Sequence, residues 1–561
     1  MIASVAIKHK VNSDLLFDYR IPDSIKIKPL SIVEVDFAGK KTLAIVIKTK
    51  TCSRRRLKDI TKVVSKGAVF TSGQVELAKK ISAYFLTPFG PTLFSFFPNL
   101  SKREIGNIES DYFTKTIARA EKSELLIMGL DQSLQYFFQI IKPNSQNIIL
   151  SPSVNKIEQI SSQMKSIYPH LPIYTWHSKI TTKQKRIIYQ NCLCDKAMIV
   201  IGSRDALFLP FRSLKNIYIA KPSAYSYFED QVPRYNAYYV VRLLKEISKC
   251  NLFVAESFPS IISYISYKKK LLSVNTSNAK LRFDLYDGFD REMQTPSMRE
   301  KIRGILTNAK SILVIGPFKN KLRNICQECK SDLVCSRCKS PFFNDEHLCL
   351  SCNTPAPTAC PSCTSRRVSL SGFMKNAITS TLPINKSNTN VTFSDLENLD
   401  DLPANFDNIL VPYFDSMYEF GFVGYKNKLL EAVCSVSYAS SNNVLIFTDK
   451  YKNELHRIES GKWENLIKVE LRERVTEQLP PYTKAVKLVS KHSHEKSLEL
   501  IKTISKKLNL KSPTFITDKK EKWTEALFLL AHDHFLKIKP ELKKYVSAKI
   551  YFVVDPVDFG V

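Results

Sequence analysis

Paired cysteines are the residues in this sequence whose spacing points most directly to a chemistry. Eight of the 13 cysteines fall within residues 326–363, where they form four C-x2-C pairs. Each pair places two thiolates on one tight turn, and two pairs complete the tetrahedral four-sulfur shell that Zn²⁺ prefers. Four pairs therefore predict two zinc ions. The predicted ligands are Cys326, Cys329, Cys335, Cys338, Cys349, Cys352, Cys360 and Cys363.

Spacing alone leaves the pairing of these cysteines open. We favour a nested arrangement, in which the outer two pairs bind one ion and the inner two pairs bind the other. Iron–sulfur binding and redox disulfides are the alternatives to zinc. The segment is too short and too polar to form its own core, so bound metal is expected to supply its folding energy. A zinc site does not by itself indicate DNA binding, since structural or partner-binding use is equally common. The other five cysteines are predicted to be packing residues.

Net charge and glycine content limit the class of function. With 83 Lys and Arg against 53 Asp and Glu, the 561-residue chain carries a formal charge of +30. Such a charge predicts attraction to a polyanion, of which nucleic acid is the usual one. Hydrophobic residues make up 44% of the chain, which excludes disorder as its main state. Only 15 residues are glycine, which disfavours chemistry built on glycine-rich phosphate loops.

Membrane and secretion signals are not expected in this sequence. The first residues lack a long apolar run, so we expect no signal peptide. The most apolar stretch, residues 85–100, is too short to span a bilayer and contains Pro88, Gly90 and Pro91. We therefore expect a cytoplasmic protein with reduced thiols and no membrane contact.

The elements that must position these residues fall into several domains, as the length of the chain suggests. Short alternating runs over residues 3–48 predict a small β domain, and residues 71–85 predict a helix. Residues 480–561 predict the order strand, helix, strand, helix, strand. Between them, apolar runs separated by helix-length segments predict two parallel α/β units. Their predicted strands are 125–128, 147–151, 197–202, 216–220 and 251–255, then 311–316, 408–411 and 443–447, with the cysteine cluster inserted in the second unit.

The order of these features resembles one family, the PriA-type replication-restart helicases, also called primosomal protein N-prime. The eight-cysteine segment resembles the zinc insert of that family. The stretches that carry the rest of the resemblance are LLFDYRIP (15–22), SIVEVDFAGKK (31–41), IGSRDALFLPFRSLKNIYI (201–219), VPRYNAYYVVRLL (232–244), ELRERVTEQLPPYTKAVKL (470–488) and VVDP (553–556).

This resemblance implies a multidomain α/β fold. Residues 1–66 would form a β domain that binds 3′ DNA ends, and residues 67–112 a winged-helix-like segment. Residues 113–300 and 301–479 would form two degenerate RecA-like parallel α/β lobes, the second of which contains the zinc insert 326–363. Residues 480–561 would form a basic α+β C-terminal domain.

The resemblance also implies a pocket for the 3′ end of DNA. Phe17, Asp18 and Tyr19 match the family's end-binding triplet, and Gly39 and Lys58 fall near its remaining positions. An aromatic ring would stack the terminal base, and Asp18 would accept a hydrogen bond from the 3′ hydroxyl. Phosphate contacts are predicted for the neighbouring run of Arg54, Arg55 and Arg56. Alternatively, Phe17 and Tyr19 are ordinary strand core and the arginine run is a solvated loop.

The residues of an ATP-driven motor are missing. Such a motor needs a G-x-x-x-x-G-K-[ST] loop and a pair of carboxylates for Mg²⁺. This chain reads GLDQSLQYF (129–137) where the family has the loop, and Ala220, Lys221, Pro222 and Ser223 where it has the carboxylates. The family's arginine-finger region reads SVSYASSNN (435–443). Asp345-Glu346-His347 mimics a helicase motif but has no strand before it, so we predict no catalytic role for it.

We therefore predict a helicase-like pseudoenzyme for replication restart that cannot hydrolyse ATP. Its predicted partners are forked, single-stranded or 3′-ended DNA and other primosome or replication proteins, and its predicted cofactor is zinc. Lysines near the C-terminus are expected to contact phosphates without sequence preference. Two alternatives stay open: an ATP-dependent 3′–5′ DNA helicase with an atypical nucleotide site, and a zinc-dependent scaffold for replication proteins.

Overall fold

The fold is described from a computed structural model of the 561-residue chain. It describes every residue except 9–15, 52–56, 109–121, 143, 278–280, 308, 317–322, 330, 332, 335, 337–341, 343–354, 372–377, 379–380, 383–388, 397–398, 400–405, 420–423, 440–443, 514, 519–522, 548 and 557–561. Within the described residues, no helix is both long enough and apolar enough to cross a membrane.

Five strands at the N-terminus form an antiparallel sheet that closes on itself, and we call it the closed sheet. The strands are β1 (Ile2–Ile7), β2 (Phe17–Arg20), β3 (Ile32–Phe37), β4 (Lys40–Lys50) and β5 (Ile60–Val63), in the order β2-β1-β4-β3-β5. The two edge strands meet because Arg20 bridges to Asp59, with its guanidinium bonded to both carboxylate oxygens. Buried apolar residues such as Val5, Val33 and Val46 fill the interior. The predicted β domain is confirmed.

Three helices follow the closed sheet, in the segment predicted to be winged-helix-like: α1 (Ser72–Tyr84), α2 (Phe89–Ser95) and α3 (Lys102–Gly106). A capping box between Thr71 and Gln74 starts α1. Helix α2 lies directly on β1, since any side chain at Gly90 would collide with the backbone oxygen of Ile7. Glycine at this position therefore lets the helices dock on the closed sheet.

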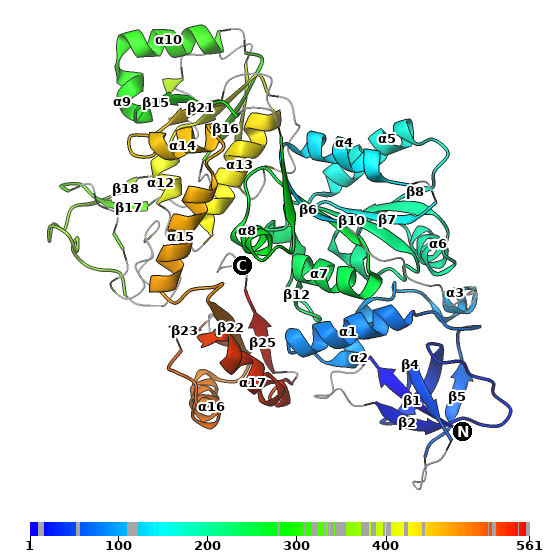
Figure 1. Ribbon diagram of the computed structural model, residues 1–561. Coiled ribbons are helices and arrows are strands. Elements are labelled where there is room, and N and C mark those ends of the chain that lie inside the picture. The colour runs from blue at the N-terminus through cyan, green and yellow to red at the C-terminus, as the bar shows by residue number, and fades with distance from the viewer. Residues whose placement is uncertain are drawn as a thin grey trace.

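Lobe 1 is a seven-stranded parallel sheet in the order β14-β6-β13-β10-β7-β9-β8. Its strands are β6 (Ser123–Ile127), β7 (Gln146–Leu150), β8 (Ile173–Trp176), β9 (Met198–Gly202), β10 (Leu214–Ala220), β13 (Asn251–Glu256) and β14 (Ser273–Thr276). Helices α4 (Leu130–Ile140) and α5 (Val154–Ile167) pack on one face, and α6 (Thr182–Leu193) and α7 (Ala237–Ser248) on the other (Figure 1). All five predicted strands are confirmed, while β8 and β14 were not predicted.

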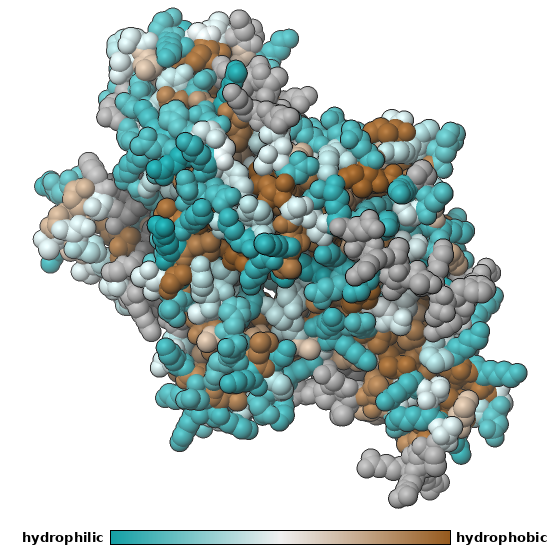
Figure 2. Space-filling view, viewed as in Figure 1, coloured by the Kyte–Doolittle hydropathy of each residue, from teal (hydrophilic) through white to brown (hydrophobic). Residues whose placement is uncertain are grey.

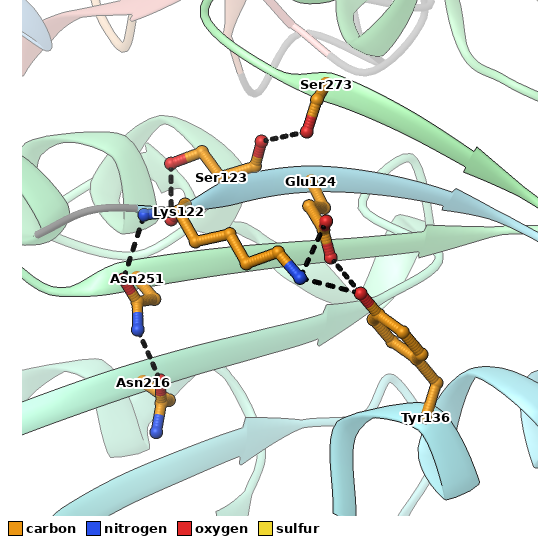
Figure 3. Close-up of polar contacts among 7 residues, drawn as sticks. All are labelled: Lys122, Ser123, Glu124, Tyr136, Asn216, Asn251 and Ser273. Atoms are coloured by element: carbon orange, nitrogen blue, oxygen red, sulfur yellow. Dashed lines mark hydrogen bonds and ion pairs between the residues drawn. The ribbon is translucent and has the colours of Figure 1, made fainter. Parts of the chain in front are cut away.

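A row of asparagines fixes the register at the amino ends of the central strands. Asn216 donates to Asn147, Asn251 donates to Asn216, and the backbone of Lys122 donates to Asn251, over distances of 2.7, 2.8 and 3.1 Å. Lys122 also bonds Glu124 and Tyr136 (Figure 3). Because buried amides must find partners, a slip of one strand would leave this whole row unpaired.

Lobe 2 is a smaller parallel sheet in the order β15-β21-β20-β16-β19. Its strands are β15 (Asp284–Tyr286), β16 (Ser311–Ile315), β19 (Asn390–Ser394), β20 (Asn408–Val411) and β21 (Val444–Phe447). The cysteine insert leaves the sheet after β16 and returns before β19. Its described strands, β17 (Arg323–Cys326) and β18 (Val368–Ser371), pair with each other and project away from both lobes (Figure 1). The prediction of two parallel α/β lobes with an insert in the second is confirmed.

The C-terminal domain is a four-stranded antiparallel sheet with two helices. It consists of β22 (Thr483–Ser490), α16 (His494–Lys507), β23 (Phe515–Asp518), β24 (Thr524–Ala531), α17 (His532–Lys544) and β25 (Ile550–Val554). The predicted order is wrong by one strand, since two strands rather than one separate the helices. The domain packs on α1, where Lys484 and Tyr84 both bond the buried Asp555. The domain limits predicted from the sequence stay predictions.

Candidate DNA-end site and metal centre

One rim of the closed sheet gathers two aromatic rings and several polar groups, and we call these residues the aromatic rim: Phe17, Asp36, Phe37, Gly39 and Lys58. Phe17 begins β2 and Phe37 ends β3, and both side chains are half-buried. Their rings meet edge to face, with centroids 4.9 Å apart. A partly exposed aromatic pair of this kind offers a base a stacking surface.

Asp36 contacts two other residues of the aromatic rim, Gly39 and Lys58. Its carboxylate accepts from the backbone N–H of Gly39 at 2.9 Å and lies 3.3 Å from Nζ of Lys58. Gly39 has a φ of +79° in the β3–β4 turn, where a side chain would be strained, and nothing lies within 4 Å of the position a Cβ would take. The rim is therefore open beside Gly39 and carries a lysine for a phosphate.

Asp18 lies on the outer wall of the closed sheet, because successive strand residues point to opposite faces. It accepts from the hydroxyl of Ser4 at 2.6 Å and lies 3.3 Å from Nζ of Lys50. The Ser4 hydroxyl above all, helped by Lys50 and Lys48, lowers the pKa of the Asp18 carboxyl below its usual range. Asp18 is therefore ionised at neutral pH and can accept a further hydrogen bond.

The predicted end-binding residues thus divide between two surfaces. Tyr19 is only 5% exposed, lies in the interior of the closed sheet, and donates its hydroxyl to the backbone oxygen of Asp36 at 2.9 Å. Tyr19 is therefore strand core, and Phe17 and Phe37 are the rings that could offer a stacking surface. The run Arg54, Arg55 and Arg56 lies outside the described residues.

Sequence reasoning missed four residues of this region. They are Phe37 and Asp36 on the aromatic rim and Ser4 and Lys50 on the outer wall. The alternation of SIVEVDF was a signal for Phe37, because it places Phe37 on the same face as Val33 and Val35. Only the pairing of β1 with both β2 and β4 brings Ser4 and Lys50 to Asp18.

The outer two cysteine pairs come together as a candidate metal centre. The sulfur atoms of Cys326, Cys329, Cys360 and Cys363 all lie within 4.8 Å of one another. Those of Cys326 and Cys363 are 3.4 Å apart, and those of Cys329 and Cys360 are 3.5 Å apart. Zinc–sulfur bonds of about 2.3 Å in a tetrahedron place sulfurs at such separations. These four cysteines are one half of the nested arrangement, and they could bind one metal ion.

The chemistry around the four sulfurs also fits a metal. A hydroxyl of Ser331 beside Cys329 lowers the pKa of that thiol to about 6, and a thiolate is the form that binds zinc. The local core is small, with Leu333 and Phe342 as its main members besides Cys326 and Cys360. The other predicted ligands, Cys335, Cys338, Cys349 and Cys352, lie outside the described residues.

The connection between β6 and α4 is the region where the resemblance would place a phosphate-binding loop, and Tyr438 packs against it. Only Met128 and Gly129 separate β6 from α4, whereas a phosphate loop of the G-x-x-x-x-G-K-[ST] type has about eight residues. An atom added at Gly129 would lie 2.8 Å from Cβ of Tyr438. Tyr438 comes from α13 (Tyr425–Ala439) of lobe 2, so the start of α4 packs against the other lobe.

The ends of the neighbouring strands also differ from a nucleotide site. After β10, Ala220 is buried and Lys221 follows with a φ of 47°. Glu256 ends β13 and is 2% exposed, and its Oε1 has no hydrogen-bond partner among the described residues. Burial, together with the neighbouring Glu431, raises the pKa of Glu256 to about 8. At neutral pH, Glu256 is therefore largely protonated and is not the carboxylate that Mg²⁺ needs.

Known proteins match the chain most specifically at the closed sheet. Residues 4–98 match a family described as a 3′DNA-binding domain (3′BD) of PriA. This stretch includes the aromatic rim, Asp18 and helices α1 and α2.

Longer stretches match curated relatives. The replication restart protein PriA of Borreliella burgdorferi is 23% identical over 353 residues, covering 56% of this chain and 54% of the relative. The replication restart protein PriA of Rickettsia felis is 25% identical over 360 residues, covering 58% of this chain and 55% of the relative.

Among solved structures, Dbp5 of S. cerevisiae bound to RNA and ADP BeF3 has a TM-score of 0.33 at 9% identity, covering 72% of this chain and 97% of that one. The chain spans about half the length of the curated relatives it matches. With its N-terminal domain and two α/β lobes in the expected order, the chain is similar to the replication restart protein PriA over these stretches.

Proposed function

We propose that this protein binds forked or 3′-ended DNA during replication restart and does not hydrolyse ATP. The observation that carries the DNA role is the aromatic rim, which lies beside the ionised Asp18 in the part of the chain that matches the 3′ DNA-binding family. The cytoplasm is the compartment in which we expect this role. The net charge of +30 supports attraction to the DNA backbone.

The terminal nucleotide would lie across the rim of the closed sheet. Its base would stack on Phe17 and Phe37, while Lys58 would meet a phosphate. Phe17 and Asp18 are adjacent where β2 begins, so a nucleotide whose base covers the aromatic rim can reach the outer wall with its sugar. There the Asp18 carboxylate would accept a hydrogen bond from the 3′ hydroxyl.

Replacing Asp18 with Asn is expected to abolish the preference for a 3′ hydroxyl over a 3′ phosphate. A terminal phosphate would be repelled by the ionised Asp18, whereas the neutral amide of Asn would repel neither end.

Replacing Phe17 with Ala is expected to weaken binding of both ends by about 5- to 150-fold. This range corresponds to the loss of one stacked base, which contributes about 1–3 kcal/mol. The measurement is fluorescence anisotropy with two otherwise identical forked DNAs.

Two controls separate end recognition from general charge. Asp23→Asn removes an exposed carboxylate that lies just after β2, and we expect it to keep the preference. Blunt duplex should bind all of these variants equally. The proposal is wrong if the unaltered protein binds both 3′ ends with the same affinity.

Three features support the absence of ATP hydrolysis. The two-residue connection before α4 leaves no loop to surround phosphates, and Tyr438 occupies the space at Gly129. Lys221 stands where Mg²⁺ would need carboxylates, and a positive charge there disfavours a metal ion. The segment 435–443 contains no arginine to stabilise the charge of phosphoryl transfer.

Adding forked DNA is therefore expected to stimulate no ATP hydrolysis by the purified protein. A coupled phosphate-release assay with Mg-ATP measures this, and a mock preparation from cells without the chain sets the contaminant level. Titration with a fluorescent ATP analogue is expected to show no saturable binding. Hydrolysis that rises with DNA and copurifies with the chain would favour the alternative, an ATP-dependent helicase with an atypical site.

The position of the cysteine insert favours a second role as a scaffold. Strands β17 and β18 project from lobe 2 into solvent (Figure 1), and Val368 is an exposed hydrophobic residue at the start of β18. A metal-stabilised projection of this kind suits contacts with primosome or other replication proteins. Deletion of the insert with retention of DNA binding but loss of such a partner in pull-down experiments would support this role.

A further inference from the structure

Lobe 1 and lobe 2 share a hydrophobic core through α8 (Ile261–Lys268), which follows the last central strand of lobe 1. Phe258, Ile261 and Tyr264 are each 3% exposed and belong to the same buried cluster as Leu429 and Val433 of α13. After α8, β14 returns to pair with β6 of lobe 1. Lobe 1 thus inserts one of its own helices into the core of lobe 2, and hydrophobic interfaces of this kind resist domain motion.

Polar contacts from α13 reinforce this shared core. The carboxylate of Glu431 accepts from the backbone N–H groups of Ser257 and Phe258 at 3.1 and 2.5 Å. One turn earlier, the amide of Asn427 donates to the backbone oxygen of Pro259 at 3.1 Å. A carboxylate that accepts two buried backbone N–H groups makes strong charge-assisted hydrogen bonds. Glu431 therefore ties the loop between β13 and α8 to lobe 2.

Two further contacts lie at either end of this junction. At one end, Tyr438 of α13 packs against Gly129 at the start of α4. At the other, Lys268 of α8 forms a 3.0 Å ion pair with Glu464 of α15 (Glu464–Thr476). Hydrophobic residues gather along the same junction in the space-filling view, where α13 meets lobe 1 (Figure 2).

We propose that α13 and α8 form a permanent clasp that holds the two lobes in one arrangement, whether or not nucleotide or DNA is bound. The clasp consists of Phe258, Ile261 and Tyr264 with Asn427, Glu431 and Tyr438. In a motor, the space between two such lobes opens and closes as nucleotide binds and leaves, which is a hinge motion around a ligand. Here side chains of the protein itself fill that space, so the lobes act as one rigid platform that carries the DNA-end domain and the cysteine insert.

Hydrogen exchange of the full-length protein tests the clasp. The readout is the peptide that covers residues 251–262, which contains the two amides that Glu431 binds. Because these amides open only when the clasp opens, their exchange is expected to be unchanged by Mg-ATP and by forked DNA. Glu431→Ala is expected to speed their exchange by at least about tenfold, because it removes both charge-assisted hydrogen bonds.

The matched control is Glu473→Ala, which removes a lobe 2 glutamate that pairs with Lys426 in an exposed ion pair, and it should change nothing in this peptide. Glu431→Gln keeps one acceptor oxygen and is expected to give an intermediate rate, which guards against general unfolding. The clasp is refuted if Mg-ATP or DNA speeds exchange as much as Glu431→Ala does, or if Glu431→Ala leaves the rate unchanged. A refuted clasp would leave the absence of ATP hydrolysis untouched, because that proposal rests on the missing loop and carboxylates.

Discussion

Stripping metal from the cysteine centre is expected to unfold the insert and leave both lobes folded. The insert has little else to stabilise it, because its described core is small. That core consists of Leu333 and Phe342 with Cys326 and Cys360, and the partly buried Ala356 packs against it. Binding of a structural zinc ion contributes about 10–16 kcal/mol in small zinc-folded peptides, far more than such a core can supply. The cores of the two lobes are separate from that of the insert and do not depend on the metal.

Hydrogen exchange of peptides around β17 and β18, before and after treatment with a chelator, measures this effect. Metal content is read in parallel, and two zinc ions per chain are expected. Cys326→Ser should lose one of them and lose protection in the insert. Cys194→Ser, which alters a partly exposed cysteine in lobe 1, should keep both. Protection that survives complete removal of metal would contradict a structural role for the centre.

Long central strands were the most predictable part of the fold. The run AMIVIG is apolar throughout because β9 is buried on both faces, and a continuous β-branched run is typical of such a strand. Strand β8 (IYTW) and strand β14 (SVNT) are short edge strands with polar residues. Their pairing is decided by the neighbours β9 and β6 rather than by their own sequence, and local patterns could not reveal it.

For the candidate DNA site, the sequence indicated several candidate residues but not which face of the closed sheet each one occupies. The resemblance placed Phe17, Asp18 and Tyr19 together, and the alternation of a strand puts Asp18 on the other face from its neighbours. Which of the two faces is interior depends on closure of the sheet through Arg20 and Asp59, residues 39 positions apart. Such a long-range contact leaves no local signal, so the sequence could not tell that Tyr19 is core.

The connection between β6 and α4 also shows what could and could not be predicted from the sequence. The loss of the phosphate loop was readable from GLDQSLQYF, because the required residue types are missing. What occupies the space was not readable, since Tyr438 comes from a helix more than 300 positions along the chain. The burial of Glu256 beside Glu431 was not readable either, because it requires the docking of the two lobes.

The burial of Glu256 gives the protein a stability that falls as the pH rises. Its pKa is raised from an ordinary value of 4.5 to about 8, mainly by burial and then by the charge of Glu431. Between these two values the folded protein holds a proton that the unfolded chain releases, so unfolding becomes easier with rising pH. One pKa unit corresponds to about 1.4 kcal/mol, so the loss across this window is on the order of 5 kcal/mol.

Several other groups surround this carboxyl. Glu431 of α13 and the Tyr238 hydroxyl of α7 interact with it electrostatically, and the backbone N–H of Ser260 donates a hydrogen bond to it at 3.2 Å. Burial raises the pKa of Tyr238, so this hydroxyl stays neutral through the window. The raised pKa of Glu256 therefore predicts that its carboxyl changes charge near the upper end of this window.

Glu256→Gln is expected to remove this pH dependence, because the amide stays neutral at every pH and can donate toward Glu431. The variant should match the unaltered protein near pH 5 and exceed its stability at pH 8, where the carboxyl would otherwise begin to ionise in an apolar site. Thermal unfolding from pH 5 to 9 measures the difference. Glu473→Gln, which changes an exposed glutamate of lobe 2, should follow the unaltered protein throughout. If Glu256→Gln is the less stable protein at pH 8, the carboxyl is ionised and held by a partner, and the protonated state inferred for this interlobe site is wrong.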